Sequence, residues 1–163
     1  MKPALLLCFL LLAAPAFARL GETTEQIEAR YGKPTKTAKP ESPATDAKVY
    51  EKNGFRITVG YYEGKSYYEQ FGKPELKEPH YFQEITETER KWLAKANNLQ
   101  PIGGYRMVTA QDGTQHEEWQ YFSLDRQSEG TYALKVLTIR SLLVEKQIEA
   151  NEKKREEDNL KDF

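Results

Sequence analysis

Apolar and polar residues follow a helical period in two short stretches of the chain. Ile27 and Tyr31 lie four residues apart in an otherwise polar segment, which places both side chains on one face of a two-turn helix. Gly32 follows directly and permits the left-handed backbone at which helices often end. A second helix is predicted from residue 87 to about residue 98. Its apolar face comprises Trp92, Leu93 and Ala96.

Strand-like runs follow each of the two predicted helices. Asn53-Gly54 and Glu63-Gly64 separate three apolar-rich runs, and glycine permits the positive φ that tight hairpin turns require. Three antiparallel strands in a meander are therefore predicted after the first helix. Three more runs follow the second helix, at residues 105–109, 116–123 and 131–140. The predicted fold class is α+β: a short helix followed by an antiparallel three-stranded meander, arranged twice, with a charged C-terminal helix.

The length of 163 residues suits one folded domain with flanking segments. The predicted divisions are a signal peptide at 1–18, a single α+β domain at 19–148 and a charged helical tail at 149–163. The domain itself divides into two similar halves, about 19–74 and 84–141. Within the first half, residues 33–48 carry three prolines and no hydrophobic period, which predicts a solvated loop.

The first 18 residues have the pattern of a cleavable export signal. A charged start is followed by a short apolar run and by Ala16-Phe17-Ala18, after which we expect cleavage. The apolar run is shorter than the roughly 20 residues that a membrane-spanning helix needs, so no transmembrane anchor is expected after cleavage. Cys8 is the only cysteine, so the mature chain would contain no disulfide or thiolate site. A periplasmic or secreted protein is predicted.

The charge balance and the residue pattern give little support for nucleic-acid binding or catalysis. Lys and Arg number 24 and Asp and Glu number 25, so no basic surface for nucleic acid is expected. His116-Glu117-Glu118 begins like a helical zinc site, but Gln120 stands where the second histidine is needed. No nucleophile motif or phosphate-binding glycine loop is present. We therefore predict a protein that is not an enzyme and that uses no cofactor or metal.

Tyrosine is unusually frequent, with 10 residues, and four of them fall in the first predicted sheet. A two-residue turn at Glu63-Gly64 pairs Gly60 with Tyr67 and Arg56 with Phe71. This register leaves the opposite face for the core and predicts a partner-binding patch. The patch comprises Arg56, Tyr62, Tyr67 and Phe71, whose side chains suit a protein surface or a sugar ring. In the alternative interpretation Tyr67 only covers Gly60 and the second helix covers the rest.

The N-terminal motif resembles a known family of envelope proteins. It reads Gly21-x-Thr23-x-x-Gln26-Ile27-x-x-x-Tyr31-Gly32-x-Pro34 and precedes antiparallel strands, as in the SmpA/OmlA (BamE) type. The related β-lactamase-inhibitory-protein architecture joins two such halves, and the predicted element order is similar to it. The resemblance implies an adaptor or inhibitor that presents a sheet surface to another protein. This sequence lacks both the lipobox cysteine of the lipoproteins and the cysteine pairs of the inhibitors.

These observations lead to three hypotheses of function. The first is an exported, non-enzymatic interaction or inhibitor-like module whose partner is an envelope or secreted protein. The second is a carbohydrate or cell-wall binding protein or hydrolase that stacks sugars on Trp92, Trp119 or the tyrosines. The third is a purely structural envelope protein.

Overall fold

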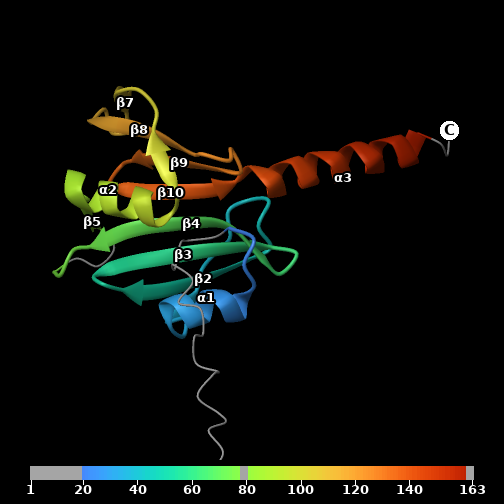
Figure 1. Cartoon of the computed structure of the whole chain (residues 1–163), viewed down its shortest axis with the longest axis horizontal. Coiled ribbons are helices and arrows are strands. Elements are labelled where there is room, and N and C mark those ends of the chain that lie inside the picture. Colours follow the sequence, from blue (N-terminus) through green and yellow to red (C-terminus); the bar gives the residue numbers. More distant parts are fainter. Residues whose placement is uncertain (1–19, 78–80, 161–163) are drawn as a thin grey trace, which may run out of the picture.

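The computed structural model describes residues 20–77 and 81–160, and the predicted signal peptide lies outside these residues (Figure 1). The described part is α+β, as the sequence predicts, with three helices and a large antiparallel sheet. The helices are α1 (Thr24–Tyr31), α2 (Glu87–Ala96) and α3 (Leu142–Leu160). The strands are β1 (Lys36–Thr37), β2 (Asp46–Lys52), β3 (Phe55–Tyr62), β4 (Lys65–Pro74), β5 (Phe82–Gln83), β6 (Leu99–Pro101), β7 (Arg106–Thr109), β8 (Gln115–Ser123), β9 (Ser128–Ala133) and β10 (Val136–Ser141).

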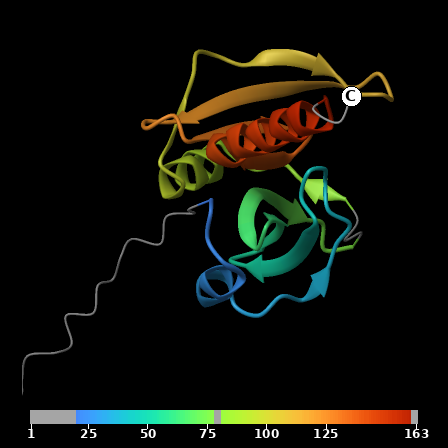
Figure 2. The same cartoon turned by 90° about the vertical axis from the view of Figure 1, so that its right-hand side faces the viewer.

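The sheet joins both halves of the chain in one layer. Its strand order is β1-β2-β3-β4-β10-β9-β8-β6, while β5 pairs with the end of β4 and β7 pairs with β8. All of these pairs are antiparallel. The two halves meet where β4 lies beside β10, with Phe71 opposite Leu137. Figure 2 shows the two parts of the sheet from the side, one with α1 and one with α3.

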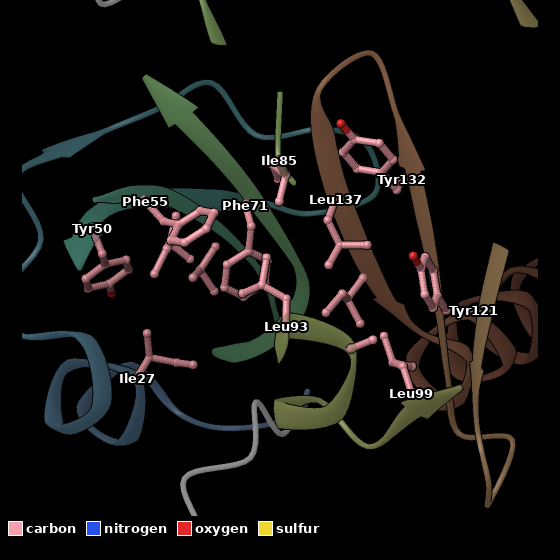
Figure 3. Packing of buried hydrophobic residues seen from close by; sticks show 14 of the residues in the cluster. Ile27, Tyr50, Phe55, Phe71, Ile85, Leu93, Leu99, Tyr121, Tyr132 and Leu137 are labelled. Atoms are coloured by element: carbon pink, nitrogen blue, oxygen red, sulfur yellow. The ribbon is translucent and has the colours of Figure 1, made fainter. Parts of the chain in front are cut away.

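The main core lies on one face of this sheet, which we call the inner face. Helices α1 and α2 contribute Ile27 and Leu93 to it, and β3 contributes Ile57 (Figure 3). Because α1 is only 8 residues long, it depends on such packing for its helical shape. The same cluster continues across β10 and β9 through Leu137 and Tyr132. One continuous apolar layer therefore holds the two halves together.

The pairing of β3 with β4 differs from the predicted register. Tyr62 pairs with Lys65 as predicted, but a β-bulge at Gly60 and Tyr61 shifts every pair beyond it by one residue. Gly60 therefore lies opposite Tyr68 instead of Tyr67. A bulge inserts one unpaired residue into one strand, and the residue alternation of the sequence gives no sign of it. The predicted faces of β4 were wrong for this reason.

The predicted strand at residues 131–140 is in fact a hairpin. β9 ends at Ala133 and β10 begins at Val136, with Leu134 and Lys135 forming a two-residue turn. Both turn residues have positive φ, 52° and 67°. Tight hairpin turns of this kind usually contain Asn or Gly. Neither residue is present at this turn, so the sequence pattern did not predict it.

The loop predicted at residues 33–48 is partly ordered against the sheet. It contains β1, and β2 begins within it at Asp46. Ala44 is buried, and Glu41 donates its backbone N–H to the Tyr68 hydroxyl (3.2 Å). Glu41 also accepts a hydrogen bond from Gln70 (2.8 Å). The segment therefore covers part of the sheet face opposite α1, which we call the outer face.

Helix α3 leaves the body of the protein at the end of β10 (Figure 1). Val144 is buried and Ile148 packs beside it, so the first two turns contact the outer face. Beyond Ile148 almost all of its described side chains are exposed and most are charged. A helix that is polar on all sides has no face to bury, which agrees with its projection into solvent.

Candidate functional site

The structure does not bring the four predicted patch residues to one surface. Arg56 lies near the start of β3, opposite Gly72 and 3.8 Å from Glu51. Tyr62 lies at the other end of the same strand and packs against the cluster that includes Val144. The predicted patch does not form as one surface, because the bulge changes the register of β4 and α3 packs over part of the outer face.

Tyr67 is buried beneath α3. Its side chain belongs to a small cluster with Tyr68 and Val144, and its hydroxyl donates to Glu145 (2.8 Å). Burial raises the pKa of the Tyr67 phenol to about 12, and the Glu145 carboxylate adds to this effect. The ring that covers Gly60 is that of Tyr68, since a Cβ at Gly60 would lie 2.1 Å from it. In the alternative interpretation Tyr67 covers Gly60 under the second helix, whereas the structure places Tyr68 over Gly60 and α3 over Tyr67.

Phe71 lies in the core on the inner face. It pairs with Ile57, is 3% exposed and meets the Tyr31 ring edge-on at 6.4 Å. Replacing Tyr67 or Phe71 by serine would remove a buried aromatic side chain and destabilise the fold. Such variants therefore do not test contact with a partner. Of the four predicted patch residues, Tyr67 and Phe71 are buried, while Arg56 and Tyr62 are partly exposed.

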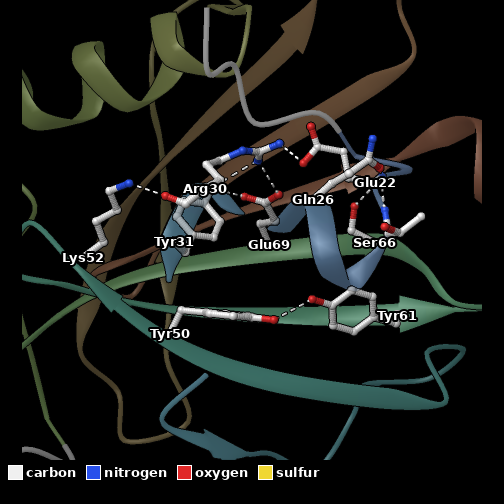
Figure 4. Close-up of polar contacts among 10 residues, drawn as sticks. Glu22, Gln26, Arg30, Tyr31, Tyr50, Lys52, Tyr61, Ser66 and Glu69 are labelled. Carbon is white, nitrogen blue, oxygen red and sulfur yellow. Dashed lines mark hydrogen bonds and ion pairs between the residues drawn. The ribbon is translucent and has the colours of Figure 1, made fainter. Parts of the chain in front are cut away.

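A buried polar network attaches α1 to the sheet (Figure 4). Glu69 is fully buried on β4 and accepts hydrogen bonds from the Tyr31 hydroxyl (2.6 Å) and from Arg30 (3.3 Å). Arg30 also pairs with Glu22. Burial raises the pKa of Glu69 above its ordinary value, while Arg30 and Tyr31 oppose that rise. Because the carboxylate is inaccessible, we assign this network a structural role.

Exposed large apolar side chains are concentrated in the second half of the chain. Among the described residues, none that is strongly exposed precedes Leu76. Three of them, about half exposed, lie on the inner face near the start of β8. They are Tyr105 (52%), Met107 (53%) and Leu134 (50%), and we call them the tip surface.

The strand register explains why Tyr105 and Met107 share a face, and Leu134 lines the same pocket as Met107. Met107 lies opposite Glu117, and Trp119 lies opposite Tyr132, whose ring belongs to the inner core. Side chains alternate along a strand, so Tyr105 and Met107 point to the same side as Trp119. The Tyr105 and Trp119 rings lie 5.5 Å apart, centre to centre. The tip surface therefore continues the inner face beyond the area that α2 covers.

Arg90 of α2 holds the aromatic side chains behind the tip surface. Its guanidinium lies 5.4 Å from the centre of the Trp119 ring and 4.6 Å from that of Tyr132. It also donates to the backbone oxygen of Ile85 (3.0 Å). Such cation–π contacts fix ring positions and stabilise each pair by about 0.5–2 kcal/mol. The Tyr132 hydroxyl donates to Glu84, and burial together with that carboxylate raises its pKa to about 12.

A pocket of about 340 Å³ opens between Met107 and Leu134. Its remaining wall is polar and carries charges of both signs. The lining residues are Glu84, Arg90, Met107, Gln115, His116, Glu117, Tyr132, Leu134 and Lys135. Glu117 is held by the Trp119 indole N–H, which donates to it at 3.1 Å. The pocket therefore combines two apolar side chains at its rim with a fixed polar wall.

The backbone that presents Leu134 is strained. A left-handed conformation brings the Cβ of a residue other than glycine too close to the carbonyl oxygen and costs about 1–2 kcal/mol. Leu134 and Lys135 both adopt it, whereas the two other tight turns use Asn53-Gly54 and Glu63-Gly64. The strained turn holds a half-exposed leucine at the rim of the pocket. Strain of this kind persists where the surrounding structure requires it, and it often marks functional positions.

A second, more apolar pocket lies between the two inner helices. It has a volume of about 200 Å³, and Tyr31, Phe71 and Leu93 form part of its wall. Trp92 lies on its rim and is 55% exposed, although the sequence predicted it to be buried on α2. Ala94 takes that buried place instead, beside Leu93.

Sequence reasoning placed Tyr105 and Met107 in a strand but did not identify them as surface residues. The alternation of β7 shows which residues share a face, but whether a helix covers that face depends on where α2 ends. Leu134 was missed because its turn was missed. The one available signal was the composition of β7, a strand of four residues in which the unbranched Met107 follows the charged Arg106.

No helix within residues 20–77 and 81–160 is long and apolar enough to cross a lipid bilayer. In the same ranges, no three His, Cys, Asp or Glu side chains lie close enough together to hold a metal ion.

Comparison with known protein families, with characterised proteins and with solved structures finds no significant match for this chain.

Proposed function

We propose that the protein is an exported, non-enzymatic interaction module that binds a protein of the cell envelope through the tip surface. The observation that carries the proposal is the grouping of Tyr105, Met107 and Leu134, each about half exposed, around one pocket. Tyrosine, methionine and arginine are enriched in protein interfaces, where anchor residues lie in pockets with a fixed wall. The aromatic side chains behind the surface are already ordered by Arg90, so little entropy would be lost on binding.

The test compares two triple variants in a crosslinking pull-down from envelope extracts. One carries Tyr105→Ser, Met107→Ser and Leu134→Ser, which remove the tip surface. The matched control carries Leu76→Ser, Leu124→Ser and Leu143→Ser, which remove three exposed leucines elsewhere (98%, 69% and 53% exposed). We expect the first variant to lose capture of the proteins that the wild type retains, and the control to keep it. Equal capture by both variants would contradict the proposal.

Carbohydrate or cell-wall binding is the second candidate function, and Trp92 is the observation that favours it. A half-exposed indole at the rim of an apolar pocket offers a flat face on which a sugar ring can stack. Trp119 is less suitable, because its ring already contacts Arg90 and Tyr105. Sedimentation with purified cell wall separates the candidates. Retention that Trp92→Ala abolishes and Tyr81→Ala leaves intact would support sugar binding over the interaction module.

We also propose that the chain consists of two repeats of the SmpA/OmlA (BamE) type, each a helix followed by a three-stranded meander. The support is the order of elements: α1 precedes β2, β3 and β4, and α2 precedes β8, β9 and β10. The last strands of the two meanders, β4 and β10, lie side by side. Periplasmic or secreted localisation belongs to the same proposal and rests on the signal-like N-terminus. Cell fractionation with N-terminal sequencing tests it, since cleavage after Ala18 is expected.

A further inference from the structure

Strand β7 forms an open edge of the sheet beside the tip surface. It pairs only with β8, and three of its four residues are exposed. An edge strand presents backbone N–H and C=O groups that no neighbouring strand uses, and another chain can pair with them. Pairing with another chain depends on which backbone groups of β7 point outward and on whether side chains protect this edge.

The register shows which backbone groups point away from the sheet. Ala110 donates to the Thr114 backbone oxygen (2.8 Å), so these residues form the hydrogen-bonded pair next to the turn. Hydrogen-bonded and non-hydrogen-bonded pairs alternate along an antiparallel ladder. Val108, two residues before Ala110, therefore faces β8, while Met107 and Thr109 direct their N–H and C=O groups outward.

The other edge strands of the described sheet carry features that discourage pairing. β1 and β5 are only two residues long, and β1 contains the exposed Lys36. β6 ends in Pro101, which lacks an N–H group. In β7 the one charged residue, Arg106, is paired with Glu118 at 2.5 Å, and there is no proline or lysine. Short strands, lysine and proline are the usual protections of sheet edges, and β7 has only its modest length of four residues.

The side chains of the tip surface specify what such a segment would contain. A residue paired with Met107 in an added antiparallel strand would place its side chain on the inner face, about 5.5 Å from Met107 between Cα atoms. Tyr105, two residues before Met107 and directly before β7, lies on the same face, where its ring contacts that of Trp119. An apolar side chain at this position would be covered by two half-exposed apolar neighbours. Every other strand pair in the sheet is antiparallel, so the added strand is expected to continue that pattern.

We propose that β7 binds an extended segment of a partner protein as an additional antiparallel strand, with an apolar side chain of that segment beside Met107 and Tyr105. This proposal rests on the proposed function, because it names the form in which the partner meets the tip surface. Backbone hydrogen bonds would supply affinity, and the alternate side chains would supply specificity.

The probe is a capped hexapeptide that alternates threonine and leucine, in two N-methylated forms. Leucines that face the tip surface would direct their N–H groups toward β7, so methylation of the leucine nitrogens should weaken binding by about tenfold. Methylation of the threonine nitrogens should have no effect, because those N–H groups point away. On the protein, Thr109→Pro removes one outward N–H and should weaken binding similarly, while Thr109→Ala keeps that N–H and should bind like the wild type.

Binding is measured by fluorescence anisotropy and by the amide shifts of Met107 and Thr109 in two-dimensional NMR. Both Thr109 variants are first checked for wild-type Tm. Unchanged amide shifts with the unmethylated peptide, or equal binding of the two methylated forms, would overturn strand addition. If Thr109→Pro retains capture of envelope proteins while the triple serine variant loses it, the tip surface binds through side chains alone. In that case the proposed function stands and this inference does not.

Discussion

The two halves of the sheet differ in how many large apolar side chains they leave exposed. In the first half Tyr50, Tyr61 and Tyr68 are all buried. In the second half Tyr121 and Tyr132 are buried as well, but Tyr105 and Met107 are each about half exposed. The two-residue turns differ as well, because Asn53-Gly54 and Glu63-Gly64 each contain a glycine, whereas Leu134 and Lys135 both adopt positive φ without one.

The difference shows how one fold can separate stability from binding. The first half has cover on both faces: α1 on the inner face, and the segment around Glu41 together with the start of α3 on the outer face. The second half has α2 on its inner face, and α2 stops short of the tip surface. We therefore regard the first half as the scaffold and the second as the part that meets a partner.

The largest expected effect comes from breaking the buried ion pair of the first half. Replacing Arg30 by methionine keeps the apolar volume but leaves the Glu69 carboxylate buried without its cation. Such a change should lower the free energy of unfolding by about 3–5 kcal/mol, measured by urea denaturation. The second substitution Glu69→Gln removes the stranded charge and should recover most of the loss.

The pH dependence of this variant gives an independent check. Burial raises the folded-state pKa of Glu69 above its value in the unfolded chain, so the folded protein binds this proton more tightly. Stability from this group is therefore greatest below the ordinary carboxyl pKa and falls as the pH rises through the folded pKa. Arg30→Met should accordingly lose less stability at pH 5 than at pH 7. An equal loss at both values would contradict a buried charge at Glu69.

A smaller effect is expected at the bulge that sets the register of the first half. A Cβ at Gly60 would lie 2.1 Å from the Tyr68 ring, which cannot move freely inside its cluster. Gly60→Ala should therefore lower the free energy of unfolding by about 1–3 kcal/mol. Gly104→Ala is the control, because a Cβ there meets nothing within 4 Å. Equal unfolding midpoints for the two variants would rule out the described packing.

The strained turn of the second half should respond in the opposite direction. Replacing Leu134 by Asn and Lys135 by Gly supplies the residues that this turn prefers, so the variant should be more stable by about 1 kcal/mol. The measurement is Tm together with envelope capture. We expect Tm to rise while capture falls, because Leu134 is part of the tip surface. A rise in Tm with full capture would show that the strain serves no binding role.

An effect of the same small size is expected in the helix that supports the tip surface. The Glu89 carboxylate accepts a hydrogen bond from the Lys73 ammonium (2.7 Å) and another from the backbone N–H of Thr86 at the start of α2 (2.9 Å). These contacts lower the pKa of Glu89. A lowered pKa means that the stabilisation is present at neutral pH and is lost as the pH falls through the folded pKa. Glu89→Gln should cost about 1 kcal/mol at pH 7. Its unfolding curve should converge with that of the wild type in acid, and a constant difference would contradict the assignment.

Local signals predicted much of the fold, and long-range packing decided the rest. The spacing of Ile27 and Tyr31 together with Gly32 located α1, and the turns at Asn53-Gly54 and Glu63-Gly64 located β2, β3 and β4. The bulge at Gly60 was not predictable, because it depends on how Tyr68 packs over the glycine. One shifted residue was enough to move Phe71 from the predicted surface into the core.

The candidate site was less predictable than the fold. Exposure of Tyr105 depends on the position of α2, and exposure of Leu134 depends on a turn that its sequence does not favour. The sequence predicted a partner-binding patch in the first half of the sheet, where two of its four residues, Tyr67 and Phe71, are buried.

The most direct test of the central claim is site-specific photo-crosslinking in the native envelope. A photoreactive phenylalanine derivative is introduced at Met107 in the second half and, separately, at the exposed Thr37 in the first half. The account predicts a discrete crosslinked partner from position 107 and none from position 37. A partner crosslinked only from position 37, or none from either position, would contradict it.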